Sequence, residues 1–156
     1  MTAGPSNPGT ANPTGRPEPT NLIRGRERVT FGVLGALSGL IAVLAGAFGT
    51  HALRDRLDPG MLQVFETAVR YQMFHALALV AVWLAEGRGR HVPLVAAGAL
   101  FASGTLLFSG SLYLLSLTGV RAWGTVTPFG GACLMAGWVS LVVAMARHRG
   151  HRAGLV

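Results

Sequence analysis

The sequence contains no lysine, a single cysteine and few charged residues, and each shortage excludes a class of protein. Cys133 has no second cysteine with which to form an intramolecular disulfide, and a thiolate metal cluster is excluded for the same reason. Charged residues make up 12% of the chain, against about 25% in an average soluble domain. Because hydrophobic residues reach 51%, the composition is typical of a membrane protein.

The basic balance of the chain comes from arginine alone and gives a formal net charge of +7. A basic protein is a candidate for nucleic-acid binding when its cations gather on one folded face. Here the arginines instead lie at the ends of apolar runs, where the orientation signals of membrane proteins lie. We therefore expect the lipid bilayer as a partner and no nucleic acid. The absence of lysine is typical of codon bias in a GC-rich bacterial genome.

Four long apolar segments account for most of the chain, at about residues 29–50, 61–85, 92–117 and 122–147. A helix over residues 29–50 spans about 33 Å, which exceeds the bilayer core of about 30 Å. The sequence therefore predicts an all-α membrane protein with four transmembrane helices within residues 24–147. A rival interpretation of the first segment is a cleaved signal peptide, because small residues at 45–47 follow an apolar core.

The fourth segment contains a proline, which leaves two possibilities for its helix. Thr127 can cap a new helix that begins at Pro128. A proline is tolerated as the first helical residue because the N–H group that it lacks would have no partner there. Alternatively, one longer helix from about residue 122 is kinked at Pro128. The sequence does not decide between these two arrangements.

Both ends of the chain are predicted to lie outside the membrane domain. Residues 1–23 hold five of the eight prolines and have little apolar surface to bury, so a disordered tail is expected. Residues 148–156 form a short basic tail. With both termini in the cytoplasm, nine arginines lie inside and three lie in outer loops, as the positive-inside rule requires. Short connections then predict an up-down-up-down bundle in the cell membrane.

Polar residues at membrane depth are costly, and the second segment holds several of them. Glu66 and Arg70 are spaced to form an ion pair near the outer surface. The other polar residues, with further ones from the remaining segments, make a candidate polar seam: His51, Tyr71, Gln72, His75, Ser109, Ser111, Tyr113 and Thr127.

Two functions fit this polar seam. The first is interhelical hydrogen bonding in a helix-packing or accessory membrane protein without catalytic activity. The alternative is a conduit for a small molecule, an ion or protons that uses His51, Tyr71 and His75. Too few ligands are present to predict a metal site or a cofactor. No catalytic residue is predicted either, because the serines at 109 and 111 lack a nucleophile elbow and an acidic partner.

Two further expectations concern packing. Small residues let helices approach closely in lipid, and the candidates for this role are Gly35, Gly39, Gly46, Gly49, Gly130 and Gly131. Such faces suit a homo-oligomer or contact with other membrane helices. His75 should face the interior and bond a polar group on another helix, for which Ser109, Ser111, Tyr113 and Thr127 are the candidates.

Four stretches of sequence also carry a resemblance to a known family: GAFGTH at 46–51, YQMFH at 71–75, FSGSLY at 108–113, and TPFGG at 127–131 with Gly137 and Trp138. Together they resemble the small four-helix membrane family called domain of unknown function 423, over about residues 30–146. Thr50 departs from the alanine usual there, which would slightly enlarge the polar seam. The resemblance implies an integral plasma-membrane protein and no known reaction, substrate or cofactor.

Overall fold

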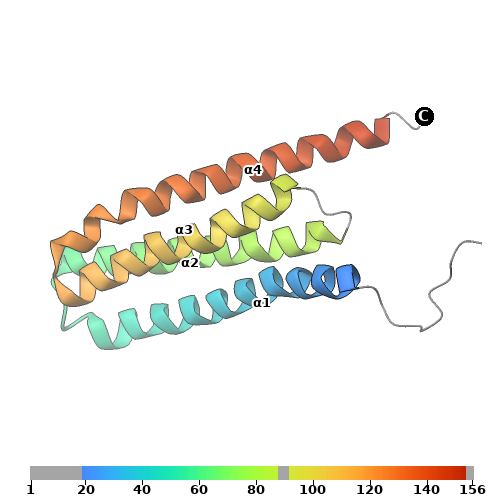
Figure 1. Cartoon of the computed structure of the whole chain (residues 1–156). Coiled ribbons are helices and arrows are strands. Elements are labelled where there is room, and N and C mark those ends of the chain that lie inside the picture. The colour runs from blue at the N-terminus through green and yellow to red at the C-terminus, as the bar shows by residue number, and fades with distance from the viewer. Residues whose placement is uncertain (1–18, 88–91, 154–156) are drawn as a thin grey trace, which may run out of the picture.

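The computed structural model describes residues 19–87 and 92–153, and the side chains within 30–87 and 92–147. Its four long helices are α1 (Pro19–Phe48), α2 (Pro59–Glu86), α3 (Val92–Thr118) and α4 (Thr127–Ala153) (Figure 1). Two short helices join them, the π-helix η1 (Gly49–Leu53) and the 3₁₀-helix η2 (Arg121–Thr125). The described residues contain no strand, so the predicted all-α fold is confirmed.

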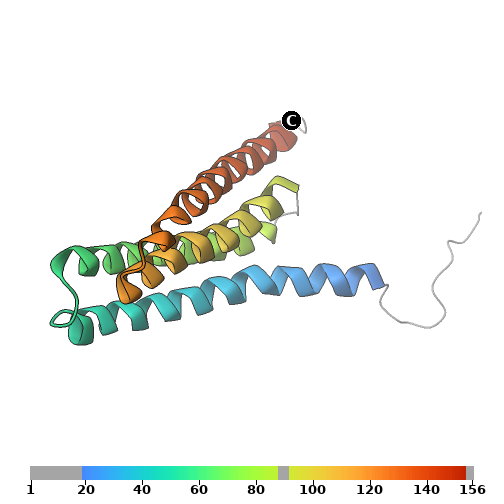
Figure 2. The ribbon, with the colours of Figure 1, turned by 60° about the vertical axis from the view of Figure 1, so that its left-hand side comes forward.

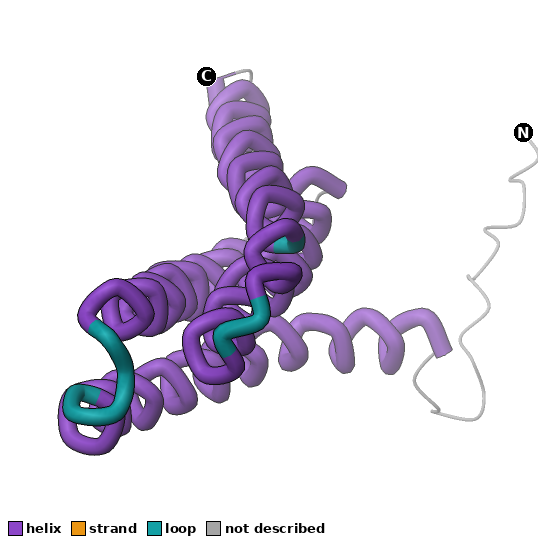
Figure 3. Tube along the Cα trace, turned by 90° about the vertical axis from the view of Figure 1, so that its left-hand side faces the viewer, coloured by secondary structure: helices purple, strands orange, loops and turns teal. Residues whose placement is uncertain are grey.

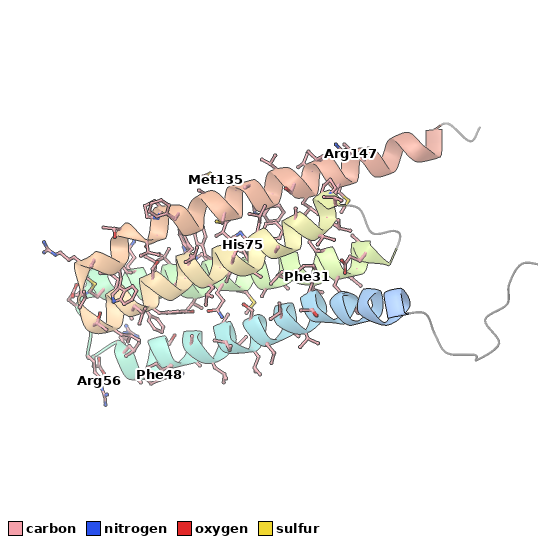
Figure 4. The ribbon with its side chains drawn as sticks, viewed as in Figure 1. Phe31, Phe48, Arg56, His75, Met135 and Arg147 are labelled. Carbon is pink, nitrogen blue, oxygen red and sulfur yellow. The ribbon has the colours of Figure 1, made fainter. Side chains whose placement is uncertain are left out.

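Each long helix contains a span that is long and apolar enough to cross a membrane. Consecutive helices run in opposite directions, so α1 begins and α4 ends at the same end of the molecule (Figure 1). Arg56 lies at one end of the bundle and Arg147 toward the other (Figure 4). The up-down-up-down order of four helices is therefore confirmed, while the side of the membrane on which the termini lie stays a prediction.

The first helix begins earlier than the sequence suggested. Residues 19–23 were expected to belong to the disordered tail, but they are helical, and α1 starts at Pro19. Proline is acceptable at a helix start because its missing N–H has no partner there. Once started, the helix continues into the apolar run without a break. The expected disorder of residues 1–18 lies outside the described residues, as do residues 154–156 of the basic tail.

The connection between α1 and α2 is shorter than the predicted loop at residues 51–60. The chain stays helical through Leu53 in η1, and Pro59 and Gly60 begin α2 instead of forming a turn. The carboxylate of Asp58 caps α2 by accepting hydrogen bonds from the N–H groups of Gly60 at 2.9 Å and Met61 at 3.1 Å. An aspartate before a proline thus marks a helix start here.

The fourth helix follows the first of the two possibilities that the proline left open. Residues 121–125 form the separate 3₁₀-helix η2, and α4 begins at Thr127, immediately before Pro128. The longer helix from residue 122 with a kink at the proline is therefore wrong. The residue before a proline is disfavoured in the α conformation, which favours a fresh start at this point. At its other end α4 continues to Ala153, beyond the predicted end at residue 147.

The closely packed pairs are consecutive helices, α1 with α2, α2 with α3 and α3 with α4. Figures 2 and 3 show α4 diverging from α1, with α2 and α3 between them. The buried core lies along α2 and α3 around Leu79 and Phe101, and Phe31 reaches it from α1. The two outer helices leave much apolar surface exposed, for example Leu44 at 61% and Val142 at 66%. Such surface is suited to lipid or to other membrane helices.

Glycines lie where these helices approach each other, but the approach is not equally close at all of them. A Cβ atom added at Gly35 would lie 2.8 Å from the carbonyl oxygen of Ala76 in α2. A Cβ atom at Gly130 would overlap the backbone of Phe108 in α3. At the other candidate packing glycines the nearest atoms are farther away, at 3.8 Å for Gly39, 3.4 Å for Gly46, 3.0 Å for Gly49 and 3.7 Å for Gly131.

Candidate functional site

Gln72 connects three helices through its side-chain amide. Its Nε2 donates to the backbone carbonyl of Ser38 in α1 at 3.1 Å. The hydroxyl of Tyr113 in α3 donates to its Oε1 at 2.8 Å. The Gln72 side chain is buried, with 7% of its surface exposed. In a bilayer an unpaired amide is costly, so both bonds favour the arrangement in which α1 and α3 lie on either side of α2.

His75 lies one turn further along α2, toward the middle of the bundle (Figure 4). Trp138 of α4 donates its indole N–H to Nε2 at 3.2 Å, so this nitrogen carries a lone pair. Nδ1 therefore carries the proton and donates it to the carbonyl of Tyr71 at 2.7 Å. The imidazole is thus neutral and held in one tautomer. A proton on Nε2 would place two N–H groups against each other.

The prediction that His75 faces the interior and bonds another helix is confirmed, because only 5% of its surface is exposed. The partner, however, is Trp138 and none of the four hydroxyl groups that the sequence suggested. Aromatic rings complete the surroundings, with ring centroids of Phe101 and Trp138 at 5.6 Å and 6.1 Å from the imidazole. Apolar packing and two hydrogen bonds together account for the position of the ring.

A second polar contact joins α3 to α4 at the end where η2 lies. Ser111 and Thr127 place their hydroxyl oxygens 2.8 Å apart, and Ser111 is also 3.0 Å from the carbonyl of Phe108. Since a hydroxyl has one proton, Ser111 donates to the carbonyl and accepts from Thr127. Thr127 therefore bonds across to another helix. Ser109, two residues earlier, is buried but makes no hydrogen bond within the described part of the chain.

The structure does not bring all members of the polar seam together. His51 is exposed in η1 at the end of the bundle, while His75 lies about 24 Å along α2 from its first residue. Tyr71 stacks on Phe108 at 4.5 Å and is 40% exposed. Thr50 is also exposed and donates to the carbonyl of Gly46, so it does not enlarge the interior polar network as expected.

One other expectation concerned an ion pair between Glu66 and Arg70. Glu66 and Arg70 are both exposed and form no ion pair in the described residues, although their spacing permits one. An ion pair between exposed side chains contributes little to stability, so its absence costs little. The described residues also contain no group of three or more His, Cys, Asp or Glu side chains that could hold a metal ion.

Three residues of this region were not identified as site residues from sequence. Ser38 contributes a backbone carbonyl, which no side-chain pattern can reveal. Trp138 lies 63 residues from His75 in the chain, and only the tertiary structure shows that its N–H reaches the imidazole. Thr105 is buried in α3, and its hydroxyl has no hydrogen-bond partner among the described residues. Its position four residues before Ser109 was the available signal.

Comparison with known sequences gives this arrangement a family. Residues 45–131, from the end of α1 into α4, match the family described as "Protein of unknown function (DUF423)". The chain belongs to the DUF423 family. The relation between sequences extends beyond those residues, because similar proteins align with about three quarters of the chain.

Three of these relatives are bacterial membrane proteins. The UPF0382 membrane protein YwdK of Bacillus subtilis is 42% identical over 119 residues, which cover 76% of this chain and 97% of the relative. The UPF0382 membrane protein SAB0533 of Staphylococcus aureus is 41% identical over 120 residues, 77% and 98% of the two chains. The UPF0382 inner membrane protein YgdD of Escherichia coli is 38% identical over 115 residues, 74% and 88%. No solved structure matches the chain.

These relatives, together with the four apolar helices, identify a multi-pass membrane protein of the DUF423 family. The family match includes Gln72 and His75 in α2 and the Ser111–Thr127 contact. Trp138 lies seven residues beyond its end, since 138 − 131 = 7. The names of the relatives assign no reaction, and the residues themselves must therefore carry any functional argument.

Trp138→Phe tests the interhelical bond to His75 in this DUF423 protein. Phenylalanine keeps an aromatic ring against Phe101 but leaves Nε2 of His75 without a donor, so we expect a loss of about 1 kcal/mol in unfolding free energy. Reversible unfolding in mixed detergent micelles, followed by circular dichroism, measures the change. Trp123→Phe is the matched control, because Trp123 is 38% exposed in η2 and has no such bond. An equal effect of both substitutions would contradict the assigned bond.

Proposed function

We propose that this DUF423 protein is an accessory protein of the cell membrane that packs against other helices and carries out no catalysis. One observation supports this proposal above the others. Two interior polar side chains of α2 already have partners within the chain: Gln72 bonds Ser38 and Tyr113, and His75 bonds Tyr71 and Trp138. Groups used in this way hold helices together and are not free to act on a substrate.

The alternative function, a conduit through His51, Tyr71 and His75, has less support. A relay histidine must gain a proton on one nitrogen and lose one from the other. In His75 the accepting nitrogen faces the N–H of Trp138, and the donating nitrogen faces a carbonyl that offers no onward path. His51 is exposed at the end of the bundle and supplies no neighbouring group. The proposal therefore gives the polar network a packing role.

Purification of the full chain in a mild detergent tests this function. We expect no stoichiometric metal by elemental analysis and no haem absorption band. A stoichiometric metal or haem that is lost in His75→Ala would overturn the proposal. Light scattering on the same sample measures self-association. The exposed apolar faces of α1 and α4 offer surfaces on which partner helices can pack. A second copy of this chain or another membrane protein would serve as that partner.

The proposed orientation places both termini in the cytoplasm, on the side where most arginines lie. Reporter enzymes fused in the connections at residues 54–58 and 119–120 should therefore give an external signal. Fusions at residues 88–91 and at the C-terminus should give a cytoplasmic signal. The reverse pattern would leave the order of helices intact but reject the proposed side. Replacement of Arg54 and Arg56 by glutamine is the control and should not invert the protein, because it strengthens the existing charge difference.

A further inference from the structure

A cavity between α1, α2 and α3 remains beside the hydrogen bonds of Gln72. Its volume is about 440 Å³, which lies in the range of about 300–1,000 Å³ typical of small-molecule sites. Leu37 and Ile41 of α1 line it and are 50% and 54% exposed, and Leu106 of α3 lines it and is 75% exposed. The cavity therefore opens sideways between α1 and α3, on a surface suited to the hydrocarbon of a membrane.

Two hydroxyl groups in the wall of this cavity have no hydrogen-bond partner among the described residues. They belong to Thr105 and Ser109 of α3, whose side chains are only 7% and 2% exposed. Four other hydroxyls of α3 each donate to a carbonyl of their own helix, those of Ser103, Ser111, Ser116 and Thr118. Thr105 and Ser109 do not use this local bond. Buried polar groups without partners are rare, and each one calls for an explanation.

We propose that this cavity binds a neutral, membrane-soluble molecule through a carbonyl oxygen that accepts hydrogen bonds from Thr105 and Ser109. The two residues are four apart on one helix face, where Cβ atoms are about 5–6 Å apart, so both hydroxyls can reach one oxygen between them. A carbonyl oxygen has two lone pairs, one for each donor. The leucine and isoleucine side chains that line the cavity then cover the apolar tail of the molecule.

The lining residues limit the charge of this molecule and the chemistry of the site. Among the residues whose side chains are described, no Asp, Glu, Lys, Arg or His lines the cavity, so a carboxylate or phosphate would lack a counter-charge from them. Ser38 also lines the cavity, and the amide of Gln72 and the hydroxyl of Tyr113, the other polar side chains of the wall, are bonded to each other. The site therefore binds its ligand without reacting with it. This inference is independent of the packing function proposed above.

A helix from a second copy of the chain fits these observations less well. Each backbone carbonyl of an inserted helix has only its second lone pair to offer, as that of Ser38 offers to Gln72, so it could serve one of the two hydroxyls but not both. The hydroxyl oxygens of Thr105 and Ser109 also lie beneath the surface of the wall, which favours a slender ligand over a whole helix. A carbonyl compound satisfies both hydroxyls at once.

The experiment uses the full chain in nanodiscs of ether-linked phospholipid, which contains no ester carbonyl. The probe is a long-chain methyl ketone, and an alkane of equal length is its control. We expect one ketone per protein, bound about tenfold more tightly than the alkane, with the infrared carbonyl stretch moved to lower frequency by hydrogen bonding. Equal binding of the two compounds with an unshifted carbonyl band would show that the hydroxyls bind no carbonyl.

Variants of the cavity wall identify the site. Thr105→Val combined with Ser109→Ala keeps the shape of the wall and removes both donors. Ketone binding should weaken about tenfold, and the infrared carbonyl stretch should return to the frequency of a carbonyl without hydrogen bonds. Stability without ligand should not fall, because neither hydroxyl has a partner to lose. Ser103→Ala is the matched control on α3 and should change nothing, since this hydroxyl bonds its own helix. Unchanged binding in the double variant would reject the assignment.

Gly110→Leu tests the cavity itself. A Cβ atom at Gly110 meets no atom within 4 Å, so leucine can enter the open space without disturbing the helices. We expect ketone binding to be lost. If the ketone does not bind the native protein and Gly110→Leu separates a dimer, a second copy occupies the cavity and the proposal is wrong. In ester-linked nanodiscs, weaker ketone binding identifies a bilayer lipid as the natural ligand, and unchanged binding identifies a free carbonyl compound.

Discussion

Gly130→Ala is expected to lower the unfolding free energy by about 3 kcal/mol, at the upper end of the usual range for overpacking. The added methyl group would overlap the backbone nitrogen of Phe108 and lie 2.7 Å from its Cα atom. A side chain in this place could rotate away, but a helix backbone can yield only if α3 and α4 move apart. Thermal unfolding in a mild detergent, followed by circular dichroism, measures the loss.

Gly131→Ala is the matched control for this substitution. A Cβ atom there would lie 3.7 Å from the ring of Phe108, which is an ordinary contact. Alanine favours the helix over glycine by about 1 kcal/mol, so this variant should be as stable as the native protein or slightly more so. A similar loss of unfolding free energy in both variants would contradict this explanation. It would mean that both glycines are needed for the start of α4, and not for close packing at Gly130 alone.

His75→Ala is expected to lower the unfolding free energy by about 3 kcal/mol, because it creates a cavity in the core and removes two hydrogen bonds. The imidazole packs against Phe101 and Trp138, and its removal leaves the N–H of Trp138 without its acceptor. His75→Asn should have an intermediate effect, since its amide can still donate to the carbonyl of Tyr71 while the acceptor for Trp138 is lost.

His51→Ala is the control for this second prediction and should change stability little, because His51 is exposed in η1. Unfolding in mixed detergent micelles compares the three variants. A conduit function predicts a different pattern. Substitution of either histidine would then abolish transport in intact membranes, whatever its effect on stability. If His51→Ala and His75→Asn both eliminate a measurable proton or ion flux while the fold remains intact, the packing function proposed here is incorrect.

The helices of this protein could be predicted from the sequence because membrane insertion is governed by local composition. Runs of apolar residues must be helical in lipid to satisfy their backbone groups, and this holds whatever their neighbours are. The number of helices and their alternating directions follow from the runs and their short connections. Helix ends were less accurate, as at Pro19 and Pro59, since a proline can begin a helix as well as interrupt one.

The hydrogen-bond partners of the interior polar groups could not be predicted from the local sequence. A neutral imidazole carries a donor and an acceptor that are costly to leave unpaired in hydrocarbon, so the inward position of His75 followed from the sequence. Which residue bonds it depends on how α2 and α4 are placed, and that placement depends on close packing such as that at Gly137 of α4, where an added Cβ atom would lie 2.7 Å from the ring of Phe101 in α3. Small shifts in such contacts would have brought a different group to the ring.

Composition thus determined that the chain is a four-helix membrane protein, because lipid acts on each segment separately. Only the tertiary structure decided that His51 and His75 lie apart and that Gln72 joins α1 to α3. It also decided that the hydroxyls of Thr105 and Ser109 lie beside a cavity without a hydrogen-bond partner in the described part of the chain. These facts depend on distances between residues far apart in the chain, which are set by the mutual fit of side chains at several interfaces at once.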